Sequence, residues 1–311
     1  MKFLHKHDID PDNLETFAKV IRRNFTVGMK EIISIAKQMK WDFLPENEQH
    51  VETVLALTRE LNHSLTQENY EVLKSLWEDP TSKRVVAEKR SHLGVTHIDY
   101  YWGRVKDIIQ PTYAPNEEDI LHVRNRTAGA YSVLIRYENS FFEFYDVGGQ
   151  KPEREKWGKI LSTVDLKAII YFVASDEWDV IDAIEDRDFS QTKLQISRAI
   201  FRELVGSDIV PKNLPVTVFL NRFDMFSERI NSDAGMKSFR ETFENYKGAD
   251  KNPKEAINCV IDFFKDGISD KHMQRVNKFH CTTALDRNAM VPIWNAVREQ
   301  IFESRLDEDL L

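Results

Sequence analysis

The fold of this chain is decided by the stretch Ala168-Ile169-Ile170-Tyr171-Phe172-Val173-Ala174, a continuous apolar run rich in β-branched and aromatic residues. Short runs of this composition predict strands that are buried on both faces. Val216–Leu220 and Val276–Cys281 are two further runs of the same kind. Strands that alternate with helices predict an α/β fold with a mainly parallel sheet covered by helices. Helical patterns separate or follow the runs at 192–205, 239–246, 253–264 and 291–302.

A hairpin is expected just before these strands. Ala130–Glu138 and Phe141–Asp146 are both rich in residues that favour strands, and the polar pair Asn139-Ser140 separates them. Two such runs joined by a short polar turn predict a β-hairpin. No comparable run occurs before residue 130.

The first third of the chain has the pattern of packed helices. Leu14, Phe17 and Ile21 recur three or four positions apart, which places them on one face of a helix. We therefore expect an all-helical domain at residues 1–115 and an α/β domain at residues 116–311. Similar apolar patterns lie at 32–39, 51–65, 70–77 and 98–109.

Composition agrees with two domains and excludes several classes of protein. The chain has 311 residues, and a domain usually takes about 150. Lysine and arginine number 43 against 51 aspartate and glutamate, a net charge of −8; a dedicated nucleic-acid binder would carry a basic surface instead. Two cysteines cannot form a disulfide framework, which favours a reducing intracellular compartment. We expect no transmembrane helix and no signal peptide, because no long apolar run is present.

Residues suited to nucleotide chemistry follow the second strand of the hairpin, in Asp146-Val147-Gly148-Gly149-Gln150. An aspartate at a strand end can hold Mg²⁺, usually through water. A following glycine lets a backbone N–H approach a phosphate oxygen closely, and a glutamine can orient an attacking water. By itself, however, Asp-x-x-Gly mostly marks a turn.

Polar residues also follow the last two predicted strands. Asn221-Arg222-Phe223-Asp224 has an amide and a carboxylate three residues apart, and the carboxylate can accept the guanine N1–H and 2-amino groups. The small residues of Cys281-Thr282-Thr283-Ala284 leave a backbone N–H free for a base carbonyl. As isolated stretches, the first is more often a capped strand-to-helix turn and the second an ordinary polar strand end.

A fourth stretch lies upstream, where Arg124 precedes Thr127 by three residues. The threonine hydroxyl can complete a Mg²⁺ shell, and the arginine can stabilise charge on a transferred phosphoryl group. The order of the four stretches is that of a GTPase, and coincidence in all four is improbable.

With these motifs the chain resembles the α subunits of heterotrimeric G proteins. The segment Asp146–Trp157 resembles their switch II, Arg124–Thr127 their switch I, Asn221–Asp224 their guanine-specificity motif and His280–Thr283 their last base-contacting loop. The helical first part resembles the helical domain inserted in this family. The resemblance implies a Ras-like GTPase domain with a mainly parallel sheet, plus an all-α domain.

The resemblance also implies roles for single residues. Arg124 is expected to act as an arginine finger in cis and Gln150 to orient the attacking water. Thr127 and Asp146 are expected at the Mg²⁺ site, and Gly149 at the γ-phosphate. The guanine base is expected to contact Asn221, Arg222, Asp224, Cys281 and Thr282, with Arg222 in the place of the family's usual lysine and Thr282 giving a backbone N–H.

One part of the family pattern has no counterpart in the sequence. No Gly-x-x-x-x-Gly-Lys-Ser/Thr phosphate loop occurs in it, and residues 1–7 resemble the end of the helix that follows that loop. The family's N-terminal helix and its first strand, which is central to the sheet, are therefore also expected to be missing. We expect weakened nucleotide binding, because the loop supplies backbone N–H groups and a lysine to the phosphates.

Two functions follow as hypotheses. The first is a GTP/GDP switch with GTPase activity, binding Mg²⁺, a βγ dimer, a seven-helix receptor and a downstream effector. Such a protein would be cytoplasmic and would reach the inner face of the plasma membrane only peripherally, through its partners. The second is a nucleotide-independent interaction protein that binds βγ, receptor or effector without cycling. Neither hypothesis includes a nucleic-acid partner.

Overall fold

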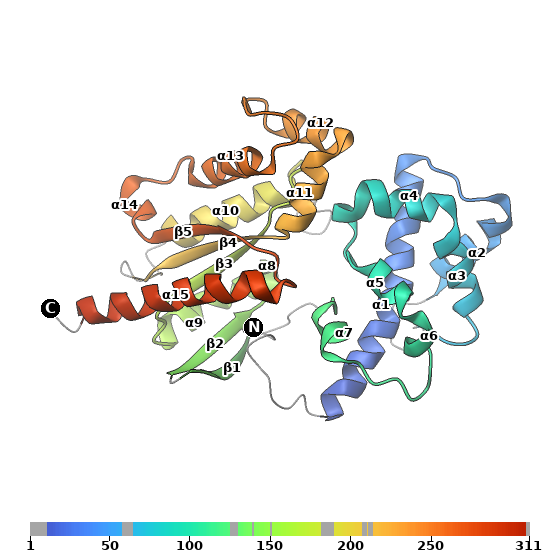
Figure 1. The fold of residues 1–311 in the computed structure, drawn as a ribbon, viewed down its shortest axis with the longest axis horizontal. Helices are drawn as coiled ribbons and strands as arrows, with labels where there is room; N and C mark the ends of the chain where they lie inside the picture. The colour runs from blue at the N-terminus through green and yellow to red at the C-terminus, as the bar shows by residue number, and fades with distance from the viewer. Residues whose placement is uncertain are drawn as a thin grey trace. The chain divides into compact units, whose positions relative to one another are not determined.

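The computed structural model describes residues 11–57, 65–124, 130–138, 140–149, 151–181, 190–206, 210 and 214–308. Contacts within the chain divide it into two compact units (Figure 1). The first unit comprises residues 1–127 and 131–146, and the second comprises residues 128–130 and 147–311. Helices together with a parallel sheet confirm the predicted α/β class, with an additional part made of helices alone. The predicted boundary at residue 115 remains a prediction.

The helical part of the first unit is organised around one long helix, α1 (Pro11–Met39). Its apolar residues recur at helical spacing, and Ile21, Phe25 and Met29 are fully buried. Helices α2 to α5 all contact α1. The other elements are the helices α2 (Glu48–Ala56), α3 (Tyr70–Glu78), α4 (Pro80–Lys89), α5 (Ile98–Gly103), α6 (Val105–Ile108) and α7 (Glu117–Leu121), with 3-10 turns at Pro45–Asn47 and Arg90–His92.

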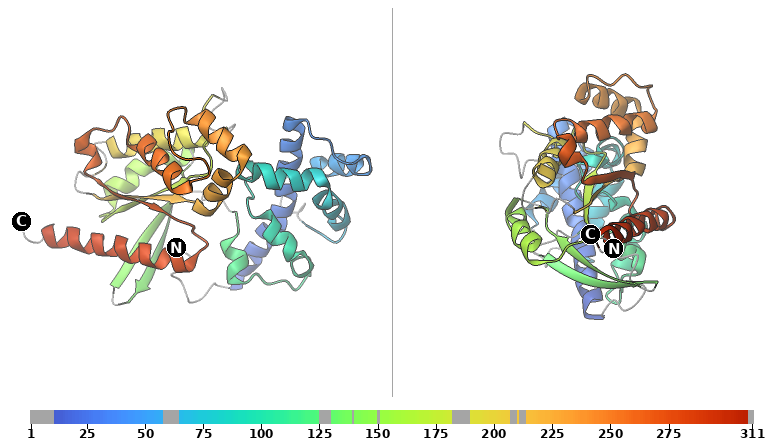
Figure 2. Two further views of the ribbon diagram at one scale, coloured as in Figure 1. Left: turned by 45° about the horizontal axis from the view of Figure 1, so that its top comes forward. Right: turned by 90° about the vertical axis from the view of Figure 1, so that its left-hand side faces the viewer.

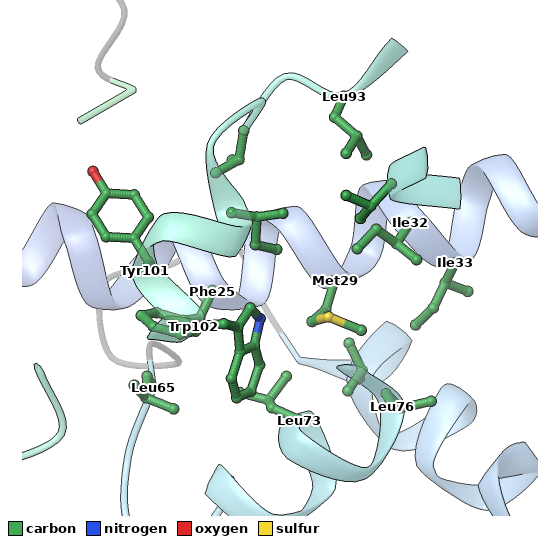
Figure 3. Close-up of a cluster of buried hydrophobic side chains, with 14 of the residues drawn as sticks. Phe25, Met29, Ile32, Ile33, Leu65, Leu73, Leu76, Leu93, Tyr101 and Trp102 are labelled. Atoms are coloured by element: carbon green, nitrogen blue, oxygen red, sulfur yellow. The ribbon is translucent and has the colours of Figure 1, made fainter. Parts of the chain in front are cut away.

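Aromatic side chains fill the centre of this helical core (Figure 3). Phe25 of α1 meets the edge of Trp102 with ring centroids 5.1 Å apart, and Trp102 also stacks on Trp77 at 5.5 Å. These rings join α1, α3 and α5, so the fold of this unit depends on contacts between segments distant in sequence.

This unit differs from prediction in a break within one helix and in one helix that was not predicted. The helical pattern at 98–109 predicts one helix, but the structure ends α5 at Gly103 and starts α6 at Val105. Between them Arg104 leaves helical geometry and donates to the buried Asp119, a contact that the local pattern does not contain. Helix α4 lacks an apolar pattern long enough to predict it, and Asp79 caps it by accepting from the Thr81 N–H at 2.8 Å.

The predicted hairpin is confirmed. Strands β1 (Ala130–Tyr137) and β2 (Ser140–Val147) form a two-stranded sheet. Ile135 is buried, whereas Tyr131, Leu134 and Phe141 are largely exposed.

The second unit is built on three parallel strands. Strands β3 (Ile169–Ala174), β4 (Val216–Asn221) and β5 (Val276–Cys281) lie in the order β3-β4-β5, and both pairings are parallel, as predicted. The first five residues of the central strand β4 are all buried, which explains its continuous apolar run.

Helices pack against this sheet and supply most of the core. Phe201 of α10 (Lys193–Gly206) is fully buried and contacts Tyr171, Phe264 and Phe279. In Figures 1 and 2, α15 (Arg287–Glu308) runs beside the sheet, apart from α10 and α13. The remaining helices are α8 (Lys151–Arg154), α9 (Trp157–Thr163), α11 (Phe223–Asn231), α12 (Asp233–Thr242), α13 (Pro253–Lys265) and α14 (Asp270–Met273).

The predicted helix at 239–246 is misplaced. Helix α12 begins at Asp233, because the Ser232 hydroxyl accepts the Gly235 N–H and so caps the helix there. It ends at Thr242, and α11 was not predicted. Among the helices that the structure describes, none is long and apolar enough to span a bilayer.

The buried helix side chain that packs on β3 and an exposed side chain of β3 itself predict different responses to mutation. Phe201→Ala should lower the free energy of unfolding by about 3–5 kcal/mol, because it leaves a cavity among buried rings. Phe172→Ala is the matched control: its side chain is 54% exposed, so the loss should be below about 1 kcal/mol. Urea denaturation measures both values, and equal losses would contradict the assigned core.

Candidate functional site

The carboxyl ends of three strands meet at one edge of the sheet. In the parallel register Ala174 lies opposite Asn221, and Leu220 lies opposite Cys281. The polar residues after each strand are therefore neighbours, although they are 46 to 63 positions apart in sequence. This edge is where open α/β sheets bind ligands.

Asn221 ties the three strand ends together. Its Oδ1 accepts the Ala284 N–H at 3.0 Å and the Thr282 hydroxyl at 3.2 Å. Its carbonyl accepts both the Ser175 N–H at 3.0 Å and the Ser175 hydroxyl at 2.8 Å. Within the described part of the chain, the Asn221 Nδ2 has no acceptor, so this amide can still donate to a ligand.

Asp224 presents a carboxylate to solvent beside Asn221. It lies in the first turn of α11, is exposed, and its Oδ1 accepts the Thr283 hydroxyl at 3.3 Å. The N-terminus of a helix stabilises a negative charge, which favours a carboxylate at this position. Asp224 therefore retains accepting positions for a ligand with adjacent N–H donors.

Thr282 and Cys281 are placed differently from expectation. Thr282 is buried and donates its N–H to the Leu220 carbonyl at 2.9 Å, so the role predicted for this N–H would require that bond to be given up. The next N–H, that of Thr283, has no acceptor among the described residues and is the better candidate. Burial raises the pKa of the Cys281 thiol, which keeps it neutral.

Arg222 is held by two carboxylates that the sequence did not single out. Its guanidinium donates to Asp176 at 2.7 Å and to Glu177 at 2.8 Å. Both acids lie just after β3, in Ser175-Asp176-Glu177, and the strand-end rule applied to Asn221 would also have identified them. Stacking of Arg222 on a base remains a prediction.

Asp176 is the most strongly perturbed carboxyl of this network. It is fully buried, and burial raises its pKa to about 7, against the opposing effect of Arg222 and Arg229 and with a further increase from Glu177. Arg229 of α11 donates to the Asp176 carbonyl and to the Asp179 carboxylate, the latter at 2.6 Å. Two arginines therefore join α11 and its preceding turn to residues 176–179.

The segment after β2 is arranged by two side chains of the following helices. The Gly148 carbonyl accepts the Trp157 indole N–H, and the Gly149 carbonyl accepts Arg154, both at 3.0 Å. Trp157 also packs on a small apolar cluster with Leu204. Gln150 lies outside the described residues, and Gly149 is exposed.

Within the first unit, Arg124 lies against Glu31 and Gly94, a position that we call the Arg124 notch. Its Nη1 lies 3.3 Å from Glu31, and the other oxygen of Glu31 accepts the Gly94 and Val95 N–H groups at 2.8 and 2.9 Å. A Cβ on Gly94 would lie 1.1 Å from Nη1, the far end of the flexible Arg124 side chain, so a larger residue there would displace that side chain.

The predicted Mg²⁺ ligands are only partly described. Asp146 is exposed near the end of β2, and Thr127 lies outside the described residues. No group of three histidine, cysteine or acidic side chains that could hold a metal occurs in the described ranges. Mg²⁺, however, usually takes one or two protein oxygens and completes its shell with phosphates and water. A carboxylate with a hydroxyl fits that requirement.

A parallel sheet with polar turns at its carboxyl edge, accompanied by a helical domain, is the architecture of the Ras-like class with an inserted helical domain. The chain belongs to the G-protein alpha subunit family, which it matches over residues 1–301. It is 28% identical to the guanine nucleotide-binding protein alpha-2 subunit of Caenorhabditis briggsae, over 98% of this chain and 84% of the relative.

Two further relatives agree. The alpha-2 subunit of Dictyostelium discoideum is 28% identical over 97% of this chain and 83% of its own length. The alpha-1 subunit of Caenorhabditis briggsae is 26% identical over 98% and 84%. The family predicted from the motifs is confirmed.

Gly94→Ala should expel Arg124 from its notch. Because the ion pair is partly exposed, we expect the free energy of unfolding to fall by about 1 kcal/mol. Gly103→Ala is the control, since a Cβ there meets nothing within 4 Å. The loss should be clearly smaller when Gly94→Ala is made in an Arg124→Ala background, where only Glu31 Oε1, 2.5 Å from the new Cβ, still has to move; urea denaturation measures both losses. An unchanged loss in that background would exclude the proposed clash.

Asp176 predicts a pH dependence of stability. Its pKa is about 7 in the folded protein and near 3.8 when unfolded, so the folded state binds the proton more tightly. The stability that this group contributes is complete below about pH 4 and is lost as the pH rises to 7. Relative to the wild type, Asp176→Asn should therefore gain stability between pH 4.5 and 7.5. Parallel curves of unfolding free energy against pH for the two proteins would refute this.

Proposed function

We propose that this chain is a guanine-nucleotide switch with GTPase activity that couples receptors to effectors. The observation that carries the proposal is the cluster of Asn221, Thr283 and Asp224 at the carboxyl edge of the sheet. It offers a free amide donor, a free backbone N–H and an exposed carboxylate within one hydrogen-bonded group.

This donor and acceptor pattern is complementary to guanine. The carboxylate of Asp224 would accept N1–H and the 2-amino group, and a backbone N–H of the Thr282-Thr283 turn would donate to the base carbonyl. Asn221 would donate its amide to a ring nitrogen while its oxygen stays fixed by Ala284. Adenine, which lacks the N1–H, would leave Asp224 without its donors.

Phosphate binding and hydrolysis would depend on residues outside this cluster. Gly149 would offer its backbone N–H to the γ-phosphate, and Gln150 would orient water. Thr127 and Asp146 would hold Mg²⁺, which neutralises charge on the phosphates. Arg124 would stabilise charge that develops on the transferred group, and to do so it must leave Glu31.

Partners and location follow from the family and are part of the proposal. The relatives are named as guanine nucleotide-binding alpha subunits. We propose a βγ dimer, a seven-helix receptor and a downstream effector as partners of this chain. The protein would be cytoplasmic and would meet the inner face of the plasma membrane peripherally, through those partners.

A nucleotide-independent interaction protein is the second candidate. It is favoured by one observation: the 311 residues contain no Gly-x-x-x-x-Gly-Lys-Ser/Thr, the sequence that cradles the phosphates in P-loop proteins. Such a protein would bind βγ, receptor or effector without a nucleotide cycle.

Base selectivity tests the proposed function. Asp224→Asn should shift the preference from guanine towards xanthine nucleotides by about tenfold or more, because hydrogen bonds to a charged group contribute roughly 1.5–3 kcal/mol each. Asp233→Asn removes the same charge at an exposed site paired with Lys251 and should leave the preference unchanged. Equilibrium titration with fluorescent GDP and XDP measures the ratio.

Two outcomes would overturn the assignment. An unchanged GDP-to-XDP ratio would show that Asp224 does not contact the base. The absence of saturable GDP or GTP binding to the wild-type chain, together with capture of a purified βγ dimer, would establish the nucleotide-independent alternative.

A further inference from the structure

We propose that Asp176 and Glu177 are positioning residues of the guanine site, which fix the turn after β4 by clamping Arg222. The inference rests on the proposed function, because it assigns the base contacts to Asn221 and Asp224. It adds two residues that follow a different strand, β3, and to which no contact with the base or the phosphates is assigned.

The turn needs an external constraint because of its backbone. Arg222 has φ 63° and ψ 34°, the left-handed region, and it is one of four non-glycine residues with positive φ in the described chain. Side chains other than glycine adopt this conformation at a cost in free energy, and it persists only where neighbouring contacts enforce it. Arg222 also immediately follows Asn221 and precedes Asp224 by two residues, so its conformation sets their separation and direction.

The two acids supply that constraint from the segment that follows β3. Nη2 of Arg222 lies 2.7 Å from Asp176, and Nη1 lies 2.8 Å from Glu177. The planar guanidinium can meet two carboxylates at once, which a lysine ammonium matches less well in geometry. Glu177 also receives Lys193, the first residue of α10, at 3.3 Å. The clamp is therefore anchored to a second helix.

The clamp itself is rigid because residues 176–179 are fixed in the core. Trp178 is fully buried between Phe226 and Phe239, and its indole N–H donates to Ser238 at 3.2 Å. Arg229 lies over the Trp178 ring and reaches back to residues 176 and 179. Arg222 thereby attaches the turn after β4 to residues 176 and 177, and Arg229 attaches α11 to residues 176 and 179.

The free energy of burying Asp176 favours a role in orienting Arg222 over a role in stabilising the fold. Asp176 is fully buried, and one of its oxygens, Oδ1, has no partner among the described residues. Burying a carboxylate with an incomplete set of partners costs free energy that an ion pair only partly recovers. What such a pair does supply is a defined orientation of the guanidinium, and hence of the turn that carries it.

The test compares GDP with IDP, whose base lacks the 2-amino group that Asp224 is proposed to accept. Asp176→Asn combined with Glu177→Gln should lower the GDP-to-IDP affinity ratio about fivefold to tenfold, because a displaced carboxylate loses its bond to that group. Arg222→Lys should give an intermediate loss. Asp266→Asn, which breaks an exposed ion pair with Arg198 elsewhere in this unit, should leave the ratio unchanged. Equal weakening of GDP and IDP would indicate general loss of structure and overturn the positioning role.

A second measurement does not depend on nucleotide. In the unliganded chain, the Phe223 N–H donates to Thr282 and the Phe226 N–H donates to Arg222. The double variant should exchange both amide hydrogens at least about tenfold faster than wild type, whereas Asp266→Asn should not. Unchanged exchange would overturn the clamp even if GDP binds. If the wild type binds neither nucleotide, the proposed function and the guanine role fail together, and faster exchange would then show only that the clamp fixes the turn.

Discussion

The parallel pairing of β4 with both β3 and β5 is the constraint on which the rest of the second unit depends. It buries the central strand on every side and aligns the three carboxyl ends at one edge. The hydrogen bonds that the Ser175 hydroxyl and the Ala284 N–H donate to Asn221 each join two of those ends. A change of register would separate all of these groups at once.

Arginine–carboxylate contacts then determine which groups remain available to a ligand. In the second unit Arg222 is occupied by Asp176 and Glu177, while Asp224 beside it stays exposed. In the first unit Arg124 is occupied by Glu31. Each arginine was expected to contact nucleotide, and each is held by acids of its own unit. The acids thus fix the conformation of each arginine, and either arginine would have to release its carboxylate partners before it could contact a ligand.

Prediction from the sequence succeeded where a local pattern had one structural solution. The run at 168–174 and the hairpin around residue 139 were recognised because continuous apolar runs with turn residues favour strands strongly. It failed at α12 and at the break after α5, where a Ser232 cap and the Arg104–Asp119 contact move the helix ends. Such contacts leave no periodic pattern in the sequence from which they could be predicted.

The sequence by itself determined the family, the order of the motifs and the chemical types at the strand ends. These three properties depend only on which residues occur and how far apart they are in the sequence, and both can be read directly from the sequence. Only the tertiary structure decided that the Thr282 N–H donates to the Leu220 carbonyl and that Arg222 pairs with Asp176. It also decided that Arg124 lies in the notch beside Gly94. Thr282 and Leu220 are 62 positions apart, Arg222 and Asp176 are 46 apart, and Arg124 and Gly94 are 30 apart. Strand register and core packing alone bring these partners together.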